Sequence, residues 1–158
     1  MFGMEKSAFA VVVTAALEEA RQRGDRRMGT EHLLLGLLRD PDLAPARALG
    51  VDLERARTAL EELDRASLRA LGIDVGEVPR ARPRKHPAVP GTALTSSARA
   101  AINQSIKATT RKVRSTAGPA QLLLALLAQG RPDPVAELID HLGIDRAEVR
   151  DRLTTVTG

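Results

Sequence analysis

Apolar residues recur at helical spacing from the start of the chain. Between Ser7 and Arg23 they fall three and four positions apart, which predicts one amphipathic helix with a single apolar face. This face consists of Phe9, Val12, Val13, Ala16, Leu17 and Ala20. Ser7 is placed to cap this helix and Gly24 to end it. A short second helix is predicted to begin at Thr30 as N-cap, with Glu31 in its first turn.

The second helix carries leucines on nearly all sides between residues 33 and 38, so it is expected to be buried. A third helix is predicted over 44–49, and a fourth from an Asp52 cap to near Leu71. The character then changes over residues 72–93, where Pro79, Pro83, Pro87 and Pro90 preclude a continuous helix. This stretch is predicted to be a linker or an extended surface loop.

The helical pattern restarts at Thr95, which can cap a fifth helix. Basic residues are expected at the end of that helix, namely Lys107, Arg111, Lys112 and Arg114. Pro119, directly after Gly118, suits the first position of a sixth helix. A seventh helix is predicted from Pro134, and Asp145 with Glu148 three residues later marks the start of the last one.

The two halves of the chain form an internal repeat. Residues 29–38 align with residues 118–127, and six of these ten positions are identical. A unit of four helices and roughly 60 residues is too small to bury its leucines alone. We therefore predict an all-α fold of about eight helices in one domain over 1–158. Repeat one (5–71) and repeat two (94–157) are expected to pack with pseudo-two-fold symmetry, joined by the linker 72–93.

Composition narrows the range of functions. The chain has no cysteine, so it offers no disulfide, no thiol nucleophile and no cysteine-based zinc site. Its three histidines, His32, His86 and His141, do not show metal-ligand spacing, and we expect neither a metal nor a cofactor. No apolar run is long enough to span a membrane and the start does not resemble a signal peptide, so a cytoplasmic protein is expected.

Charge is distributed unevenly along the chain. Residues 78–132 contain ten basic residues and no acidic residue, whereas the two flanking segments are each net acidic. Three interpretations remain open for this basic block: a solvated face, a docking surface for an acidic protein partner, and a nucleic-acid-binding surface. The very low aromatic content, 1%, removes the stacking platforms on which single-stranded nucleic acids are bound, so nucleic acid is the least favoured partner.

A family resemblance rests on the repeat and on the run Gly29-Thr30-Glu31-His32, which is followed by Leu33-Leu34-Leu35-Gly36-Leu37-Leu38. Together they resemble the Clp N-terminal domain, the double repeat that precedes the ATPase rings of Clp unfoldases, and the ClpC branch in particular. The chain lacks a phosphate-binding P-loop motif, so we expect a stand-alone domain without the ATPase modules.

The resemblance implies a docking platform that binds adaptor proteins and, in some ClpC members, phosphoarginine. It places Gly29, Thr30, Glu31 and His32 at that ligand site, with Glu31 binding the guanidinium. Two plainer interpretations stay open: Glu31 only complements the helix dipole, and His32 is a structural residue. At the aligned position the second repeat has Ala120 after Pro119, so at most one such site is expected. The resemblance also suggests a peptide or adaptor surface, formed by Phe2, Arg82, Arg84 and Lys85.

The resulting hypothesis is a non-enzymatic binding module that modulates ClpC-type proteolysis. Its expected partners are Clp unfoldase and protease components, adaptor proteins or degradation substrates. It could recruit ligands to the protease or act as a decoy, and a decoy could also sequester a peptide antibiotic that targets the domain. The alternative is a basic accessory protein that binds an anionic partner such as nucleic acid. An enzyme is the least favoured class, because no nucleophile, metal or cofactor motif is present.

Overall fold

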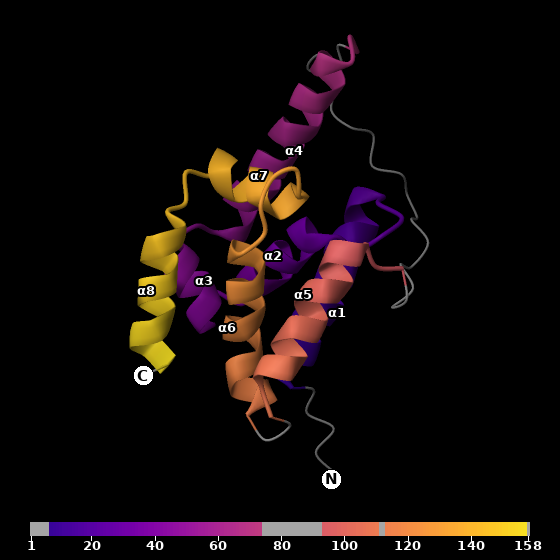
Figure 1. Ribbon diagram of the computed structural model, residues 1–158. Coiled ribbons are helices and arrows are strands. Elements are labelled where there is room, and N and C mark those ends of the chain that lie inside the picture. Colours follow the sequence, from indigo (N-terminus) through magenta and orange to yellow (C-terminus); the bar gives the residue numbers. More distant parts are fainter. Residues whose placement is uncertain (1–6, 74–92, 111–112, 158) are drawn as a thin grey trace.

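The computed structural model describes residues 7–73, 93–110 and 113–157, and these ranges contain eight helices and no β-strand. The all-α prediction is thereby confirmed (Figure 1). The first four helices are α1 (Ala8–Arg23), α2 (Thr30–Leu38), α3 (Ala44–Leu49) and α4 (Leu53–Ala70). The last four are α5 (Ser96–Ala108), α6 (Arg114–Leu127), α7 (Pro134–His141) and α8 (Arg146–Thr157).

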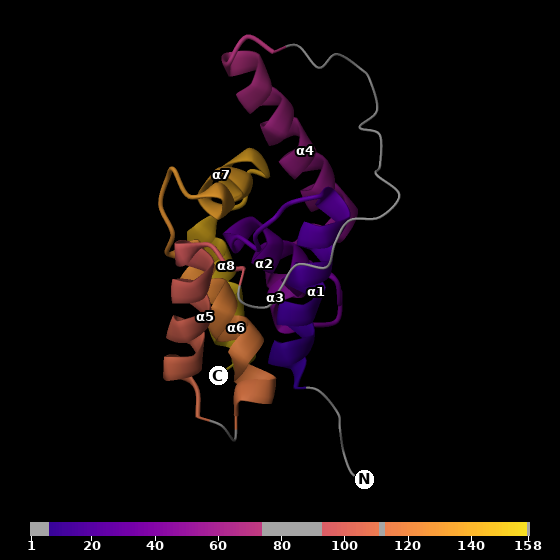
Figure 2. The same cartoon turned by 90° about the vertical axis from the view of Figure 1, so that its right-hand side faces the viewer.

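The helices of the two halves pack against one another reciprocally. Helix α1 packs on α6 while α2 packs on α5, and α3 packs on α8 while α4 packs on α7. Exchanging the two halves turns the α1–α6 pair into the α5–α2 pair, and the α3–α8 pair into the α7–α4 pair. This is the predicted pseudo-two-fold arrangement. Figures 1 and 2 show the exception to this symmetry: the C-terminal part of α4 extends beyond the body of the molecule.

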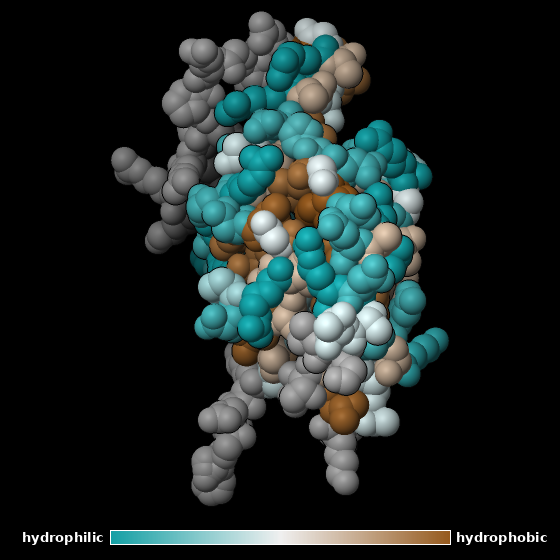
Figure 3. All heavy atoms as spheres, turned by 90° about the vertical axis from the view of Figure 1, so that its left-hand side faces the viewer, coloured by the Kyte–Doolittle hydropathy of each residue, from teal (hydrophilic) through white to brown (hydrophobic). Residues whose placement is uncertain are grey.

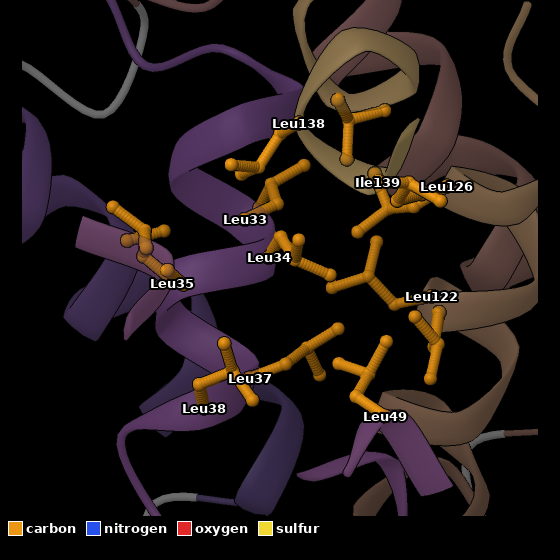
Figure 4. Packing of buried hydrophobic residues seen from close by; sticks show 14 of the residues in the cluster. Leu33, Leu34, Leu35, Leu37, Leu38, Leu49, Leu122, Leu126, Leu138 and Ile139 are labelled. Carbon is orange, nitrogen blue, oxygen red and sulfur yellow. The ribbon is translucent and has the colours of Figure 1, made fainter. Parts of the chain in front are cut away.

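The core is built from the two leucine runs that the sequence singled out. In Figure 4, Leu33 and Leu34 of α2 face Leu122 and Leu126 of α6, and residues of α7 close the same cluster. All of these leucines are fully buried. A fully buried leucine side chain stabilises the folded state by roughly 2 kcal/mol, so this shared cluster holds the halves together.

Helices α1 and α2 approach each other closely at Gly36. A Cβ atom at this position would lie 2.5 Å from the Val12 carbonyl oxygen and 3.0 Å from the Ala16 nitrogen, both backbone atoms of α1. Only glycine permits this contact. In the second half, Gly118 of α6 allows a similarly close contact with α1, because a Cβ at this position would lie 3.0 Å from the Phe9 ring.

Most of the predicted helix ends are confirmed. Ser7, Asp52 and Thr95 accept hydrogen bonds from the backbone N–H groups of Ala10, Arg55 and Ala98, as N-caps do. Gly24 ends α1 in the left-handed conformation, with φ 78°. The prediction for α2 is wrong by one residue, because Gly29 is the N-cap and Thr30 is the first helical residue.

The start of α6 is also predicted wrongly. Helix α6 begins at Arg114, so Pro119 lies inside the helix instead of at its first position. Of the basic residues expected at the end of α5, Lys107 lies in its last turn, whereas Arg114 is the first residue of α6. Arg111 and Lys112 lie outside the described residues. Helix α5 ends early because the Thr109 backbone is extended and its hydroxyl bonds the Ser105 carbonyl at 2.9 Å.

The backbone before α2 is joined to the backbone before α5. Met28 donates from its N–H to the Ala93 carbonyl at 2.9 Å, and its own carbonyl accepts from the Thr95 N–H at 3.0 Å. This short parallel bridge fixes the loop ahead of α2 against the second half of the chain. Within the described ranges, none of the helices combines the length and apolar character needed to cross a lipid bilayer.

Candidate functional site

The signature residues 29–32 form the N-terminus of α2, beside the loop that follows α1 and the N-terminus of α7. Gly29 has an extended backbone, and the helix begins immediately after it. The buried leucines that follow in α2 hold this helix in the core, so its first turn is fixed in place. The candidate site is therefore presented by a rigid element.

His32 connects two parts of the site. Its side chain is 1% exposed, its Nδ1 accepts the Gly29 N–H at 2.9 Å, and its Nε2 lies 2.7 Å from Oδ2 of Asp25. Because Nδ1 acts as an acceptor, the ring proton must be on Nε2, which donates to the carboxylate. This arrangement supports the structural interpretation of His32, which positions Gly29 and the preceding loop.

Glu31 folds back over the start of its own helix. Its carboxylate lies against Gly29, in the space that a Cβ at residue 29 would occupy. The side chain is 17% exposed, and Oε2 is shielded from solvent without a hydrogen-bond partner in the described structure. Burial raises the pKa of Glu31 above its ordinary value, although the neighbouring His32 opposes the shift. An unpaired buried carboxylate oxygen is a ready acceptor for a cationic donor.

Thr30 ties the site to the second half of the chain. Its side chain is fully buried, and its hydroxyl donates to Oδ1 of Asp133. The same carboxylate oxygen caps α7 by accepting the Val135 N–H at 3.1 Å. This contact explains why Thr30 is not the cap of α2, because its hydroxyl faces α7 instead of its own helix. Sequence reasoning missed Asp133, and only its position before Pro134, typical of an N-cap, could have suggested it.

Charged groups surround the first turn of α2. Arg23 donates from Nε to Asp25 at 3.2 Å and also bonds Asp64 of α4. Arg26 and Arg27 are exposed on the loop that leads to Gly29. Among the described residues, no group of three histidine, aspartate or glutamate side chains could hold a metal ion.

The aligned stretch of the second repeat has a different environment. Residues 118–121 lie within α6, and Ala120 is only 4% exposed. This stretch offers neither a helix start nor a carboxylate. The other predicted surface residues, Phe2, Arg82, Arg84 and Lys85, lie outside the described residues.

Two shallow apolar grooves lie away from Glu31. One, of about 460 Å³, runs between α1 and the end of α2 and includes Val11, which is 49% exposed, and Leu43. The other, of about 430 Å³, lies among the ends of α2, α3 and α4 and includes Val51 and Leu53. Figure 3 shows apolar surface gathered between polar residues on the side of the molecule nearest α8 in Figure 1. Sequence reasoning had not predicted these grooves.

Comparison with known proteins agrees with this architecture. The family model described as the Clp repeat (R) N-terminal domain matches residues 6–80. The crystal structure of the N-terminal domain of the caseinolytic protease associated chaperone ClpD from Arabidopsis thaliana matches over 100% of both chains, with a TM-score of 0.64 and 17% identity. The predicted resemblance to Clp N-terminal domains is thereby confirmed, with the family match lying on the first half of the chain.

The relatives of this chain are much longer proteins. Chaperone protein ClpC1 of the rice chloroplast (Oryza sativa subsp. japonica) is 44% identical over 68 residues, which cover 41% of this chain and 7% of that protein. The Bacillus subtilis protein named negative regulator of genetic competence ClpC/MecB is 27% identical over 161 residues, covering 100% of this chain and 18% of its own length. The chain thus spans less than a fifth of the length of these relatives.

Replacing Glu31 by glutamine is expected to raise the free energy of unfolding of this domain by about 1 kcal/mol at pH 7. A carboxyl whose pKa is raised by folding costs stability at pH values where it ionises. The gain should therefore disappear as the pH falls below 4.5, the ordinary value, where both folded and unfolded chains are protonated. Urea unfolding at several pH values measures this difference, and a loss of stability at pH 7 would show that Glu31 has a stabilising partner.

Proposed function

We propose that this chain is a protein-binding module of the Clp system, in which Glu31 accepts a guanidinium group from a bound protein. The observation that carries the proposal is the buried Oε2 of Glu31, which has no partner in the described structure. Keeping such an oxygen unpaired costs stability, and residues with this kind of cost concentrate at functional sites.

The comparisons support the Clp setting. Among the relatives are proteins named as ATP-binding subunits of the ATP-dependent Clp protease, and this chain matches only a small part of each. The ligand implied by the resemblance is an arginine or phosphoarginine side chain on an adaptor or a degradation substrate. A peptide antibiotic would use the same surface. We propose binding without catalysis, because the side chains around Glu31 hold one another through hydrogen bonds and none of them is an activated nucleophile.

The module can act as a decoy or as a recruiter, and one assay separates these two modes of action. Bacillus subtilis ClpC, supplied with its peptidase and ATP, degrades an arginine-phosphorylated fluorescent test protein while this chain is added in increasing amounts. A decoy slows the loss of fluorescence once it is in excess over ClpC. A recruiter accelerates the loss at low ratios. An unchanged rate at every ratio contradicts the proposed function.

Two matched variants test whether the change in degradation rate depends on Glu31. Glu31→Ala is expected to abolish the change in rate, because it removes the proposed guanidinium acceptor. Glu61→Ala, which removes an exposed carboxylate on α4, is expected to leave the change intact. Equal loss in both variants would indicate a general electrostatic effect instead of a site at Glu31.

A further inference from the structure

The end of α4 exposes two large apolar side chains. Leu71 is 76% exposed and Ile73 is 51% exposed, and both lie where the helix extends beyond the body of the molecule (Figures 1 and 2). We call residues 65–73 the α4 tip. Single exposed apolar side chains are ordinary, but large ones placed together at the end of a projecting helix are typical of a contact surface.

Backbone hydrogen bonds fix the shape of the α4 tip. The Gly72 N–H donates to the Arg69 carbonyl at 3.0 Å, and the next N–H, of Ile73, donates to the Leu68 carbonyl at 2.8 Å. Gly72 has φ 82°, so the helix ends in a complete Schellman motif. Because this turn is already ordered, docking it on another surface would cost little conformational entropy.

The same turn occurs at two other places in the chain, and there it is packed. The sequence Leu-Gly followed by Val or Ile and then Asp is found at 49–52, 71–74 and 142–145. Leu49 is 3% exposed and Leu142 is 8% exposed, and the residues after the two glycines, Val51 and Ile144, pack against the core. The turn is therefore a docking element elsewhere in the chain, whereas at the α4 tip its apolar side chains are exposed.

The groove of about 460 Å³ between α1 and the end of α2 offers an apolar surface to such an element. Val11 is 49% exposed there, and Ala15 and Leu43 also line it. We call it the α1–α2 groove. In both views the α4 tip and the start of α1 lie at opposite ends of the molecule (Figures 1 and 2). The tip therefore cannot fill the groove of its own chain, but it can reach the groove of a second copy.

The rim of the α1–α2 groove is acidic. Asp40 lines the groove and Asp42 lies next to it in the chain, and both are exposed without an ion pair in the described ranges. The one cation of the lining, Arg39, is matched by the buried Glu19. A partner that carries positive charge beside its apolar side chains would therefore suit this groove.

The α4 tip has that combination of groups. Arg65 and Arg69 are exposed one helical turn apart, and neither forms an ion pair with a carboxylate in the part of the chain that the structure describes. The acidic residue between Leu63 and Arg65, Asp64, is already paired with Arg23. The tip thus presents apolar side chains together with two unmatched cations.

We propose that copies of this chain associate head to tail, with the α4 tip of one copy seated in the α1–α2 groove of the next. The two apolar side chains of the tip would pack on Val11 and Leu43, and its two arginines would meet Asp40 and Asp42. Because tip and groove are different surfaces, each docked pair leaves one tip and one groove available, so the contact repeats instead of closing as a dimer. This association does not involve Glu31 and goes beyond the proposed function.

Sedimentation velocity of the full chain tests the association from about 10 μM to about 500 μM, because a single helix end in a groove forms a small, weak interface. We expect the average sedimentation coefficient to rise with concentration without stopping at the value of a dimer. Added salt should reduce the rise, because it screens the exposed charges. A monomer at every concentration would overturn the proposal.

Variants of each surface locate the contact. Leu71→Ser/Ile73→Ser is expected to raise the dissociation constant about tenfold or more, because it removes the apolar part of the tip. Val11→Lys should have a similar effect, since it places a cation in the groove opposite the arginines. The control is Ile106→Ser on α5, a residue that is 36% exposed, and it should leave association unchanged. Equal loss in the control would show non-specific apolar association and overturn the proposal.

A mixture of the two surface variants gives the sharpest test. The tip variant keeps its groove and the Val11→Lys variant keeps its tip, so only one contact can form between them. We expect each variant alone to stay monomeric and the mixture to form a one-to-one dimer that does not grow further. No association in the mixture would overturn the proposal. Circular dichroism checks that the variants are folded, and Arg65→Glu/Arg69→Glu replaces the serine variant if that one is not.

Discussion

Replacing Glu19 by alanine is expected to lower the free energy of unfolding by about 3 kcal/mol. The Glu19 side chain is 2% exposed and binds two guanidinium groups, with Arg39 Nη2 at 2.9 Å and Arg57 Nη2 at 2.7 Å from Oε2. These contacts join α1 to the end of α2 and to α4. Without the carboxylate, two cations would face each other at this junction. Both arginines are about a third exposed, so water partly solvates the unpaired charges. The expected loss of stability therefore lies at the low end of the range for breaking buried ion pairs.

Urea unfolding followed by circular dichroism measures the loss, and Glu18→Ala provides the control. Glu18 is the adjacent residue, but its side chain is 43% exposed and its contact with Arg21 is 3.8 Å long. Its replacement should change stability by less than about 0.5 kcal/mol. Similar losses in the two variants would show that the buried ion cluster contributes little beyond a surface pair.

The pH dependence of this cluster has a definite sign. Burial alone would raise the pKa of Glu19, but hydrogen bonds from Arg57 and Arg39 hold it below its ordinary value of 4.5. A carboxyl whose pKa is lowered by folding stabilises the protein above that ordinary value, and the contribution is lost as the pH falls through the lowered pKa. The difference between the original chain and Glu19→Gln should therefore be full at neutral pH and shrink in acid.

The second large effect is expected for Gly36→Ala, which should destabilise the domain by about 2 kcal/mol. Alanine favours a helix over glycine by about 1 kcal/mol, so a neutral site would gain stability. At Gly36 the added Cβ meets backbone atoms of Val12 and Ala16, and backbone cannot move away as a flexible side chain can. Helices α1 and α2 would have to separate along the contact that defines the first half of the fold.

Gly130→Ala is the matched control for this prediction. A Cβ at Gly130 would meet no atom within 4 Å in the described structure, so its replacement should be close to neutral. Thermal unfolding of both variants, compared with the original chain, separates the steric effect from the general effect of removing a glycine. A stable Gly36→Ala variant would mean that the two helices can shift apart at little cost.

Local signals in the sequence predicted the local structure well. The caps at Ser7, Asp52 and Thr95 act within a few residues of themselves, and a pattern of leucines reports burial directly. The error at Thr30 arose because a contact with a distant segment overrode the local preference for an N-cap. The error at Pro119 arose because α6 begins several residues before the proline. Thr30 bonds a side chain 103 residues away, which no local rule could have shown.

The candidate site was only partly predictable for the same reason. Glu31 was singled out through the family resemblance, but its unpaired oxygen depends on how the carboxylate folds back over Gly29. The partners of Glu19 lie 20 and 38 residues further along the chain, so its burial could not be inferred from the amphipathic pattern of α1. Polar contacts between remote residues are the part of a structure that periodicity does not encode.

The environment of Ala120 limits how this domain could acquire a second site. In the first repeat the aligned residue is a carboxylate at a helix start, whereas Ala120 is a 4% exposed residue inside α6, close to the packing of Gly118 on the Phe9 ring. A glutamate introduced there would be an uncompensated buried charge, and Pro119 would still lack its N–H. A single substitution at residue 120 would therefore not reproduce the Glu31 environment in the second repeat.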